Sequence, residues 1–174
     1  MRRLAEVSEC NRPSRRAAII DAQAQPQPER VMIPRPFEYR FTVQLHDTDA
    51  AGRLFFAHLF RHAHDAYEAL MREIGQPLPP MIAAQTLLLP LTHAEADYLQ
   101  PMQHGEQISV EVEVLELRQR AFSLGYRFLD ADGRLAARAR TVHVQIALEP
   151  GSARTLAPEL RAALEPHLTA ASTE

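Results

Sequence analysis

The chain has 174 residues and a formal net charge of −3 at pH 7. This length suits one domain with a sizeable core, and the acidic balance argues against a general nucleic-acid binder, whose binding face is basic. The single cysteine, Cys10, excludes a disulfide framework within the chain and fits a reducing cytoplasm. No apolar run approaches the roughly 18 residues of a membrane-spanning helix. We therefore expect a cytoplasmic protein that binds neither nucleic acid nor a membrane.

The first 35 residues differ in composition from the rest of the chain. They are rich in Arg, Ala, Gln and Pro and have no sustained hydrophobic period. The apolar stretch Ala17–Ile20 is too short for a secretory signal, and the acidic residues around it argue against an organellar transit peptide. We expect a flexible N-terminal extension at residues 1–35, a folded domain at residues 36–168 and a frayed C-terminus at residues 169–174.

A strand and a long helix open the folded part. Apolar and polar residues alternate over Phe37–His46, which predicts a half-buried strand. From Phe56 onward, apolar residues recur at 3-then-4 spacing, which predicts a helix of about 18 residues with one buried stripe. Gly75 supplies a left-handed stop and Pro77 lies just beyond it. The polar side of this helix is expected to carry His58, Arg61, His62, Asp65, Arg72 and Glu73.

Further strand patterns follow the helix. Residues 76–84 are rich in proline and predict a connection without regular structure. Leu87–Leu99 is strand-like, and Pro90 within it indicates an edge position, a bulge or a break. Alternation over Ile108–Val114 predicts a strong strand, and its change of phase after Val114 favours a bulge.

The last part of the chain predicts two more strands and a short helix. The strands cover Phe122–Phe128 and Arg134–Leu148, with a hairpin turn at Asp130–Gly133. Pro158–Leu164 begins with proline at a first-turn position, which is typical of a helix start. The order of strand, long helix and four strands predicts an α+β fold, in which one antiparallel sheet packs one face against one helix.

Two carboxylates stand in the loop before the long helix. Asp47 and Asp49 precede the small residues Ala50–Gly52, and the helix begins a few residues later. The first turn of a helix carries unpaired N–H groups and the positive end of the helix dipole, which can stabilise an oxyanion. A carboxylate beside it can attack a carbonyl or activate a water. Both aspartates also fit a purely structural role as Asx-turn or capping residues.

The helix also carries three histidines whose spacing suggests a metal site. His58 and His62 are separated by four residues and therefore share a face, and His64 lies nearby. The His-Glu-X-X-His arrangement is absent, however, and His93 and His104 belong to other elements. We expect no metal site, and a solvated or substrate-facing role for these histidines.

At this loop and helix the sequence resembles a known family. The segments DTDAAGRLFFA (residues 47–57) and HAHDAYEAL (residues 62–70) are similar to the hot-dog-fold acyl-CoA thioesterases of the 4-hydroxybenzoyl-CoA thioesterase type, and especially to the 1,4-dihydroxy-2-naphthoyl-CoA hydrolases. The segment AEADYLQPMQHGEQISVEVEV (residues 94–114) resembles the family's second signature, a Tyr-X-X-Pro stretch before a Gly-acidic turn and a strand. The resemblance covers about residues 37–165 and is more specific for fold and reaction than for substrate.

The resemblance implies a hot-dog fold, in which a five-stranded antiparallel sheet wraps one long helix and active sites lie at a dimer interface. It implies that Asp49 is the catalytic carboxylate and that the backbone N–H of Phe56, seven residues later, polarises the thioester carbonyl. Asp47, Gly52 and His58 are implied as supporting residues. Asp49 would act as a nucleophile through a mixed anhydride or as a general base for water. No cofactor is implied, since coenzyme A is part of the substrate.

The chain departs from the family pattern in two places. Arg53 and Leu54 replace the usual Val-Val or Ile-Val pair, and Phe55-Phe56 replaces a pair that usually contains Tyr. Both departures bear on the acyl group rather than on hydrolysis. Coenzyme A is anionic, and the cations expected to meet it are Arg118, Arg120, Arg138 and Arg140. The first two of these arginines also fit a merely solvated hairpin corner.

The leading hypothesis is an acyl-CoA thioesterase that hydrolyses an aromatic or medium-sized acyl-CoA to the free acid and CoA. It would act as a homo-oligomer, either a dimer or a tetramer. An acyl-carrier-protein thioesterase and a non-catalytic acyl-CoA-binding hot-dog protein are the alternatives. A metal-dependent hydrolase is a fourth hypothesis.

Overall fold

A computed structural model describes residues 36–84, 87–147 and 155–169 of the chain. Every structural statement below refers to these residues. The expected N-terminal extension at residues 1–35 and residues 170–174 of the expected frayed C-terminus lie outside them.

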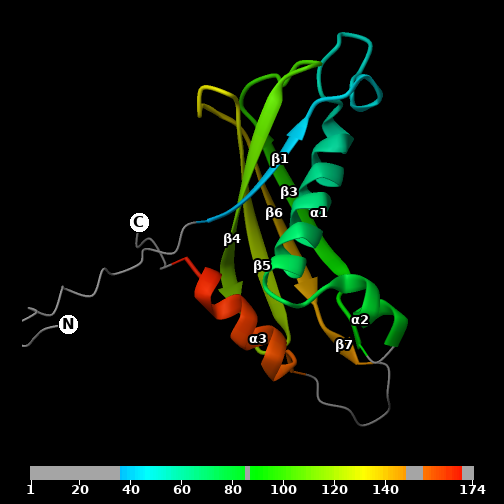
Figure 1. Cartoon of the computed structure of the whole chain (residues 1–174), viewed down its shortest axis with the longest axis vertical. Helices are drawn as coiled ribbons and strands as arrows, with labels where there is room; N and C mark the ends of the chain where they lie inside the picture. Colours follow the sequence, from blue (N-terminus) through cyan, green and yellow to red (C-terminus); the bar gives the residue numbers. More distant parts are fainter. Residues whose placement is uncertain (1–35, 85–86, 148–154, 170–174) are drawn as a thin grey trace, which may run out of the picture. The chain divides into compact units, whose positions relative to one another are not determined.

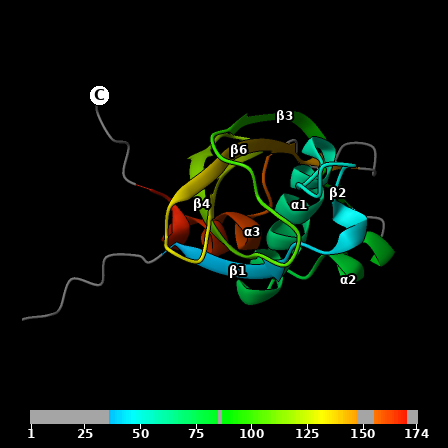
Figure 2. The same ribbon diagram turned by 90° about the horizontal axis from the view of Figure 1, so that it is seen from above.

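Five strands form one antiparallel sheet in the order β1-β4-β5-β6-β3. The strands are β1 (Phe37–Thr42), β3 (Leu91–Tyr98), β4 (Gln107–Leu117), β5 (Ala121–Leu129) and β6 (Leu135–Val144). The short strands β2 (Leu87–Leu88) and β7 (Ile146–Ala147) pair with each other in a second sheet. Figure 2 shows the main sheet curving around α1 (Phe56–Glu73). The predicted order of strand, long helix and four main strands is confirmed.

The helix α1 packs on the concave face of the sheet (Figure 2) and runs along its strands (Figure 1). The apolar stripe that the 3-then-4 spacing predicts is buried at Leu59, Ala63, Ala66, Tyr67 and Leu70, whereas Phe56, the first residue of the expected stripe, is 62% exposed. The buried side chains share one core with the inward residues of β4 and β5, among them Val112 and Leu124. Gly75 has a φ of 74°, which confirms the predicted left-handed stop.

Three local expectations are corrected. The first strand ends at Thr42 because Leu45–Asp47 forms the 3-10 turn η1. Residues 76–84 contain a helix, α2 (Leu78–Ala84), where a connection was expected. Its two prolines, Pro79 and Pro80, lie in the first turn, where missing N–H donors cost no helical hydrogen bond. The third correction concerns His62, which was expected on the polar side of α1 and is instead buried, with 7% of its surface exposed.

The strand irregularities that the sequence predicted are present. The chain breaks at Pro90 between β2 and β3, and the pairing of β4 with β5 shifts between Val114 and Glu116, as expected for a bulge. The predicted C-terminal helix is α3 (Pro158–Leu164), which buries Leu160 and Leu164 and runs on into the 3-10 turn η2 (Glu165–His167).

A polar cluster lies in the core between α1 and the sheet. His143 is 2% exposed, and its ring stacks on Tyr67 and Phe122 at centroid distances of 4.3 and 5.1 Å. Its Nε2 is 3.2 Å from the hydroxyl of Thr141, which is 3.0 Å from the hydroxyl of Tyr126. Burial lowers the pKa of His143 to about 4.

This cluster makes the stability of the protein depend on pH. The unfolded chain binds a proton at His143 near its ordinary pKa of 6.5, whereas the folded chain does so only near pH 4. The contribution of the neutral His143 to the free energy of unfolding is therefore fully present above pH 6.5. It is lost as the pH falls towards 4, by roughly 3 kcal/mol in all. Urea unfolding at pH 7 and pH 4.5 measures this loss.

His143→Phe should remove most of that pH dependence, because it keeps a flat ring in the stack and removes the titrating group. The matched control is His104→Gln, which replaces an exposed loop histidine. An equally steep pH dependence in His143→Phe would contradict the assignment.

Candidate active site

A tight hairpin joins η1 to the start of α1. The N–H of Asp49 donates to the carbonyl of Arg53 at 2.8 Å, and the N–H of Gly52 donates to the carbonyl of Asp49 at 3.0 Å. Thr48 and Leu54 form an isolated antiparallel bridge on either side. Gly52 has a φ of 69°, a conformation that costs a residue with a Cβ about 1 kcal/mol or more. Gly52, predicted as a supporting residue, therefore shapes the turn that carries Asp49.

The carboxylate of Asp49 lies exposed at this turn. Its Oδ1 accepts the N–H groups of Ala51 at 2.8 Å and of Arg53 at 3.2 Å. This is the Asx-turn that the sequence offered as the structural alternative. Oδ2 accepts no hydrogen bond from the described residues. The turn thus orients the carboxylate through one oxygen and leaves the other available to a ligand.

The start of α1 is not capped by any side chain that the structure describes. The N-cap residue is Phe55, which makes no capping hydrogen bond, and the first turn holds no acidic residue. The N–H of Phe55 donates to the carbonyl of Asp47 at 2.9 Å. In the described chain the N–H groups of Phe56 and Ala57 have no acceptor. The positive end of the helix dipole is therefore open to an oxyanion or a carbonyl oxygen.

One pocket of about 450 Å³ is lined by both Asp49 and Phe56. Apolar and aromatic side chains form much of its wall, and three of them are unusually exposed: Phe56 by 62%, Leu99 by 54% and Tyr98 by 47%. Exposed apolar side chains gathered around a pocket indicate a binding site. The structure therefore brings together the two residues that the sequence predicted as catalytic.

Tyr98 joins the edge of the sheet to the first turn of α1. It is the last residue of β3, and its hydroxyl donates to the carbonyl of Phe56 at 2.7 Å. Partial burial raises the pKa of Tyr98, so the phenol stays protonated and remains a donor at neutral pH. Sequence reasoning missed this contact, although Tyr98 opens the Tyr-X-X-Pro signature.

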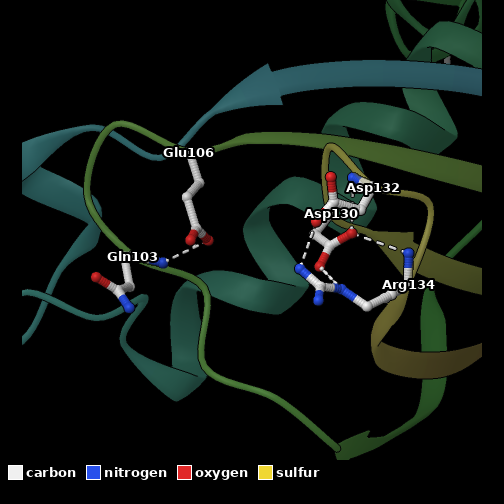
Figure 3. Close-up of polar contacts among 5 residues, drawn as sticks. All are labelled: Gln103, Glu106, Asp130, Asp132 and Arg134. Carbon is white, nitrogen blue, oxygen red and sulfur yellow. Dashed lines mark hydrogen bonds and ion pairs between the residues drawn. The ribbon is translucent and has the colours of Figure 1, made fainter.

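The loop between β3 and β4 supports the hairpin. The carbonyl of Met102 accepts the N–H of Leu54 at 2.8 Å, and the carbonyl of Gly52 accepts the N–H of His104 at 3.0 Å. The loop holds its own shape through the carboxylate of Glu106, which accepts the N–H of Gln103 at 2.8 Å (Figure 3).

The β5–β6 turn appears in the same view. Asp130 and Asp132 both pair with Arg134 in this turn, at 2.9 and 2.5 Å (Figure 3). The predicted hairpin turn at Asp130–Gly133 is thereby confirmed.

Asp47 is placed differently from Asp49, because its carboxylate is fully buried and does not line the pocket. Its Oδ2 accepts the N–H of Gln44 at 3.0 Å. Its Oδ1 faces three histidine nitrogens: His62 Nε2 at 3.3 Å, His46 Nε2 at 3.5 Å and His58 Nδ1 at 4.0 Å. Burial raises the pKa of Asp47, but the Gln44 N–H and the neighbouring positive groups outweigh it, so the pKa lies below its ordinary value.

The histidines do not form a metal site of recognisable geometry. No group of three or more His, Cys, Asp and Glu side chains within the described ranges is arranged to hold a metal ion. His58, predicted as a supporting residue, lies beside Asp47 at the start of α1 and is one-third exposed.

Within one chain the four predicted CoA-binding arginines do not line the pocket of Asp49. Arg138 and Arg140 lie on β6 and line a second pocket of about 360 Å³ together with Glu95 and Asp97. Arg140 lies 3.6 Å from Glu95. Their part in CoA binding stays a prediction.

Arg118 and Arg120 lie at the β4–β5 corner. Arg118 pairs with Glu116 at 2.7 Å. The corner is at the far end of β4 from Gln107, roughly 30 Å along the strand at ~3.3 Å per residue. Their role in CoA binding also stays a prediction.

The sequence profile of the Thioesterase-like superfamily matches residues 43–164 of the chain. The chain is 34% identical over 111 residues to a 1,4-dihydroxy-2-naphthoyl-CoA hydrolase of Rippkaea orientalis, which is 63% of this chain and 80% of that relative. It is also 34% identical over 127 residues to a hydrolase of the same name from Trichodesmium erythraeum, which is 72% of this chain and 92% of the relative.

Solved structures agree with these relatives. A 1,4-dihydroxy-2-naphthoyl-CoA thioesterase from Synechocystis matches 74% of this chain and 94% of its own with a TM-score of 0.69 and 31% identity. A gentisyl-coenzyme A thioesterase shares the fold, with a TM-score of 0.67 and 22% identity over 74% of this chain and 99% of its own. Among the described residues, no helix combines the length and apolar character needed to cross a membrane. The chain belongs to the Thioesterase-like superfamily with its hot-dog fold, and the predicted enzyme class, thioester hydrolase, is confirmed.

Proposed function

We propose that this protein hydrolyses an aromatic or medium-sized acyl-CoA to the free acid and CoA. The observation that carries the proposal is the common pocket of Asp49 and the uncapped start of α1. Hydrolysis of a thioester needs a group that attacks the carbonyl carbon and a donor that stabilises the oxyanion. In this proposal Asp49 supplies the attacking group, and the start of α1 supplies the donor.

In the proposed mechanism the thioester oxygen accepts the N–H of Phe56, and the helix dipole stabilises the negative charge that develops there. Asp49 reacts through Oδ2, the oxygen that the Asx-turn leaves without a bond. It either attacks the carbonyl carbon to give a mixed anhydride, which water then hydrolyses, or takes a proton from an attacking water. In both routes CoA leaves as the thiolate. Coenzyme A is part of the substrate, and the proposal requires no cofactor.

An aromatic acyl group is supported by the walls of the pocket. Phe55 and Phe56 have tilted rings with centroids 4.5 Å apart, and Tyr98 and Leu99 line the same pocket. Such surfaces favour a flat apolar group. Two relatives described above are named for hydrolysis of 1,4-dihydroxy-2-naphthoyl-CoA, whose acyl group is a bicyclic aromatic. Arg53 also lines the pocket and adds a positive charge that suits the anionic substrate.

A homo-oligomer in the cytoplasm is proposed as the working form. β3 pairs only with β6 among the described strands, so its other edge is open, and seven of its eight residues are exposed. An open strand edge can pair with a second copy through backbone hydrogen bonds. Tyr98 at the end of this edge lines the pocket, so a partner at β3 would lie beside the site.

The proposal is tested by release of free thiol from a panel of aromatic and aliphatic acyl-CoAs, with wild type and Asp49→Asn side by side. Asparagine keeps the Asx-turn and removes the charge. We expect the variant to lose on the order of 10²-fold or more in kcat while its melting temperature stays close to that of wild type.

Full activity in Asp49→Asn would rule out the assigned role. Hydrolysis of carrier-protein thioesters alone would favour an acyl-carrier-protein thioesterase. Acyl-CoA binding without turnover by wild type would favour a non-catalytic binding protein.

Tyr98→Phe isolates the hydrogen bond to the first turn of α1. One hydrogen bond contributes about 0.5–1.5 kcal/mol, so we expect kcat to fall by roughly 2- to 10-fold. The ring stays in the pocket wall, so KM for an aromatic acyl-CoA should change little. The matched control is Tyr39→Phe, which alters a half-buried tyrosine of β1 that does not line the pocket. If kcat falls no more in Tyr98→Phe than in Tyr39→Phe, the hydrogen bond from Tyr98 does not contribute to turnover.

A further inference from the structure

The carboxylate of Asp47 is buried with one oxygen unsatisfied. Oδ1 has no hydrogen bond of good geometry in the described chain, although the residue is 0% exposed. A buried charged oxygen without a partner costs several kcal/mol, so folded proteins place a donor beside it. The donor that Asp47 uses should therefore be found among the groups that surround Oδ1.

Of the three described histidines that surround Oδ1, His62 is the nearest and the one whose whole side chain is buried. Its Nε2 lies 3.3 Å from Oδ1 and likewise has no other partner of good geometry among the described residues. His46 is at 3.5 Å with a side chain 64% exposed, and His58 is at 4.0 Å. His46 can bond to water, whereas His58 Nδ1 is buried but lies beyond hydrogen-bond distance of Oδ1. Of these three histidines, His62 is therefore the best placed to donate to Asp47.

The ring of His62 is held in place by its surroundings. It stacks on Phe41 of β1 with a centroid distance of 3.7 Å and an interplanar angle of 9°. On its other edge, Nδ1 lies 3.8 Å from Asp65 on the same helix. Burial lowers the pKa of His62, although Asp47 and Asp65 oppose this shift. A mainly neutral ring at neutral pH that carries its hydrogen on Nε2 is a donor to Asp47.

Asp47 connects this ring to both parts of the site. Its carbonyl accepts the N–H of Phe55, the residue immediately before Phe56. Along the chain it is two residues from Asp49. A shift of Asp47 would therefore move the attacking carboxylate and the start of the helix relative to each other, and small errors of this kind are costly in catalysis.

We propose that His62 is a positioning residue, which donates from Nε2 to Asp47 and thereby holds the hairpin of Asp49 against the first turn of α1. His62 does not line the pocket of Asp49. Its effect on turnover rests on the function proposed above, whereas its effect on the hairpin does not.

The test compares His62→Phe with His62→Gln. Phenylalanine keeps a ring against Phe41 and removes the donor, whereas the amide of glutamine can place an N–H near the position of Nε2. We expect His62→Phe to lower kcat about 10-fold or more with KM changed less than about 3-fold, and His62→Gln to recover most of the loss. His64→Phe, on the exposed part of the same helix, is the matched control and should leave kcat unchanged.

Amide hydrogen exchange provides a readout that does not need activity. Peptides covering residues 48–57 should exchange faster in His62→Phe than in wild type, while peptides from β5 should be unchanged. Asp47→Asn should give the same pattern, and combining it with His62→Phe should add little, because both substitutions break one contact. Asp47→Asn also carries the test if His62→Phe does not fold.

Two results would overturn the proposal. One is unchanged exchange at residues 48–57 in a folded His62→Phe or Asp47→Asn variant. The other is a His62→Gln variant that is no better than His62→Phe in either readout. If wild type hydrolyses no thioester, the proposed function fails, and the exchange experiment still decides whether His62 positions the hairpin.

Discussion

The uncapped start of α1 is the constraint on which the rest of the site depends. A helix start leaves N–H groups without partners, and most helices satisfy them with Ser, Thr, Asp or Asn at the N-cap. Here the N-cap is Phe55, which has no side-chain oxygen to offer. The first turn must therefore be held by groups that do not occupy its donors. The carbonyl of Asp47 and the hydroxyl of Tyr98 meet this condition, since one binds the preceding N–H and the other binds a carbonyl.

The two aspartates of the motif differ in burial and, in the function proposed above, in their roles. Asp49 is exposed, and its turn is closed by hydrogen bonds within five consecutive residues. Asp47 is buried, and it links η1, the hairpin and α1. Low solvation suits a carboxylate that only holds structure, provided that its oxygens are satisfied, whereas a reacting carboxylate needs access to substrate. The spacing of one residue between them places one side chain inward and the other outward.

Local patterns in the sequence predicted the elements well. The helix over Phe56–Glu73, its stop at Gly75 and the bulge after Val114 follow from periodicity and glycine conformation, which are properties of neighbouring residues. The sequence does not predict helix α2, because proline interrupts a helix everywhere except in its first turn, where Pro79 and Pro80 lie.

Contacts between distant segments were not predictable in the same way. The sequence places His62 among the polar residues of the helix, next to Arg61. Its ring is buried because Phe41, on β1, stacks against it. The bond from Tyr98 to Phe56 spans 42 residues. Such contacts depend on how the sheet curves around the helix, and no local period encodes that curvature.

The turn of Asp49 has an evolutionary consequence. Its hydrogen bonds use Oδ1 as an acceptor for backbone N–H groups, a role that the amide oxygen of asparagine fills equally well. Folding therefore places no demand on the charge at this position, and selection for a stable protein alone would not retain it. A duplicated copy released from the need to hydrolyse could lose the carboxylate by a single-nucleotide change and keep an intact pocket. Thioester hydrolases and thioester receptors with this turn are in that sense immediate neighbours in sequence space.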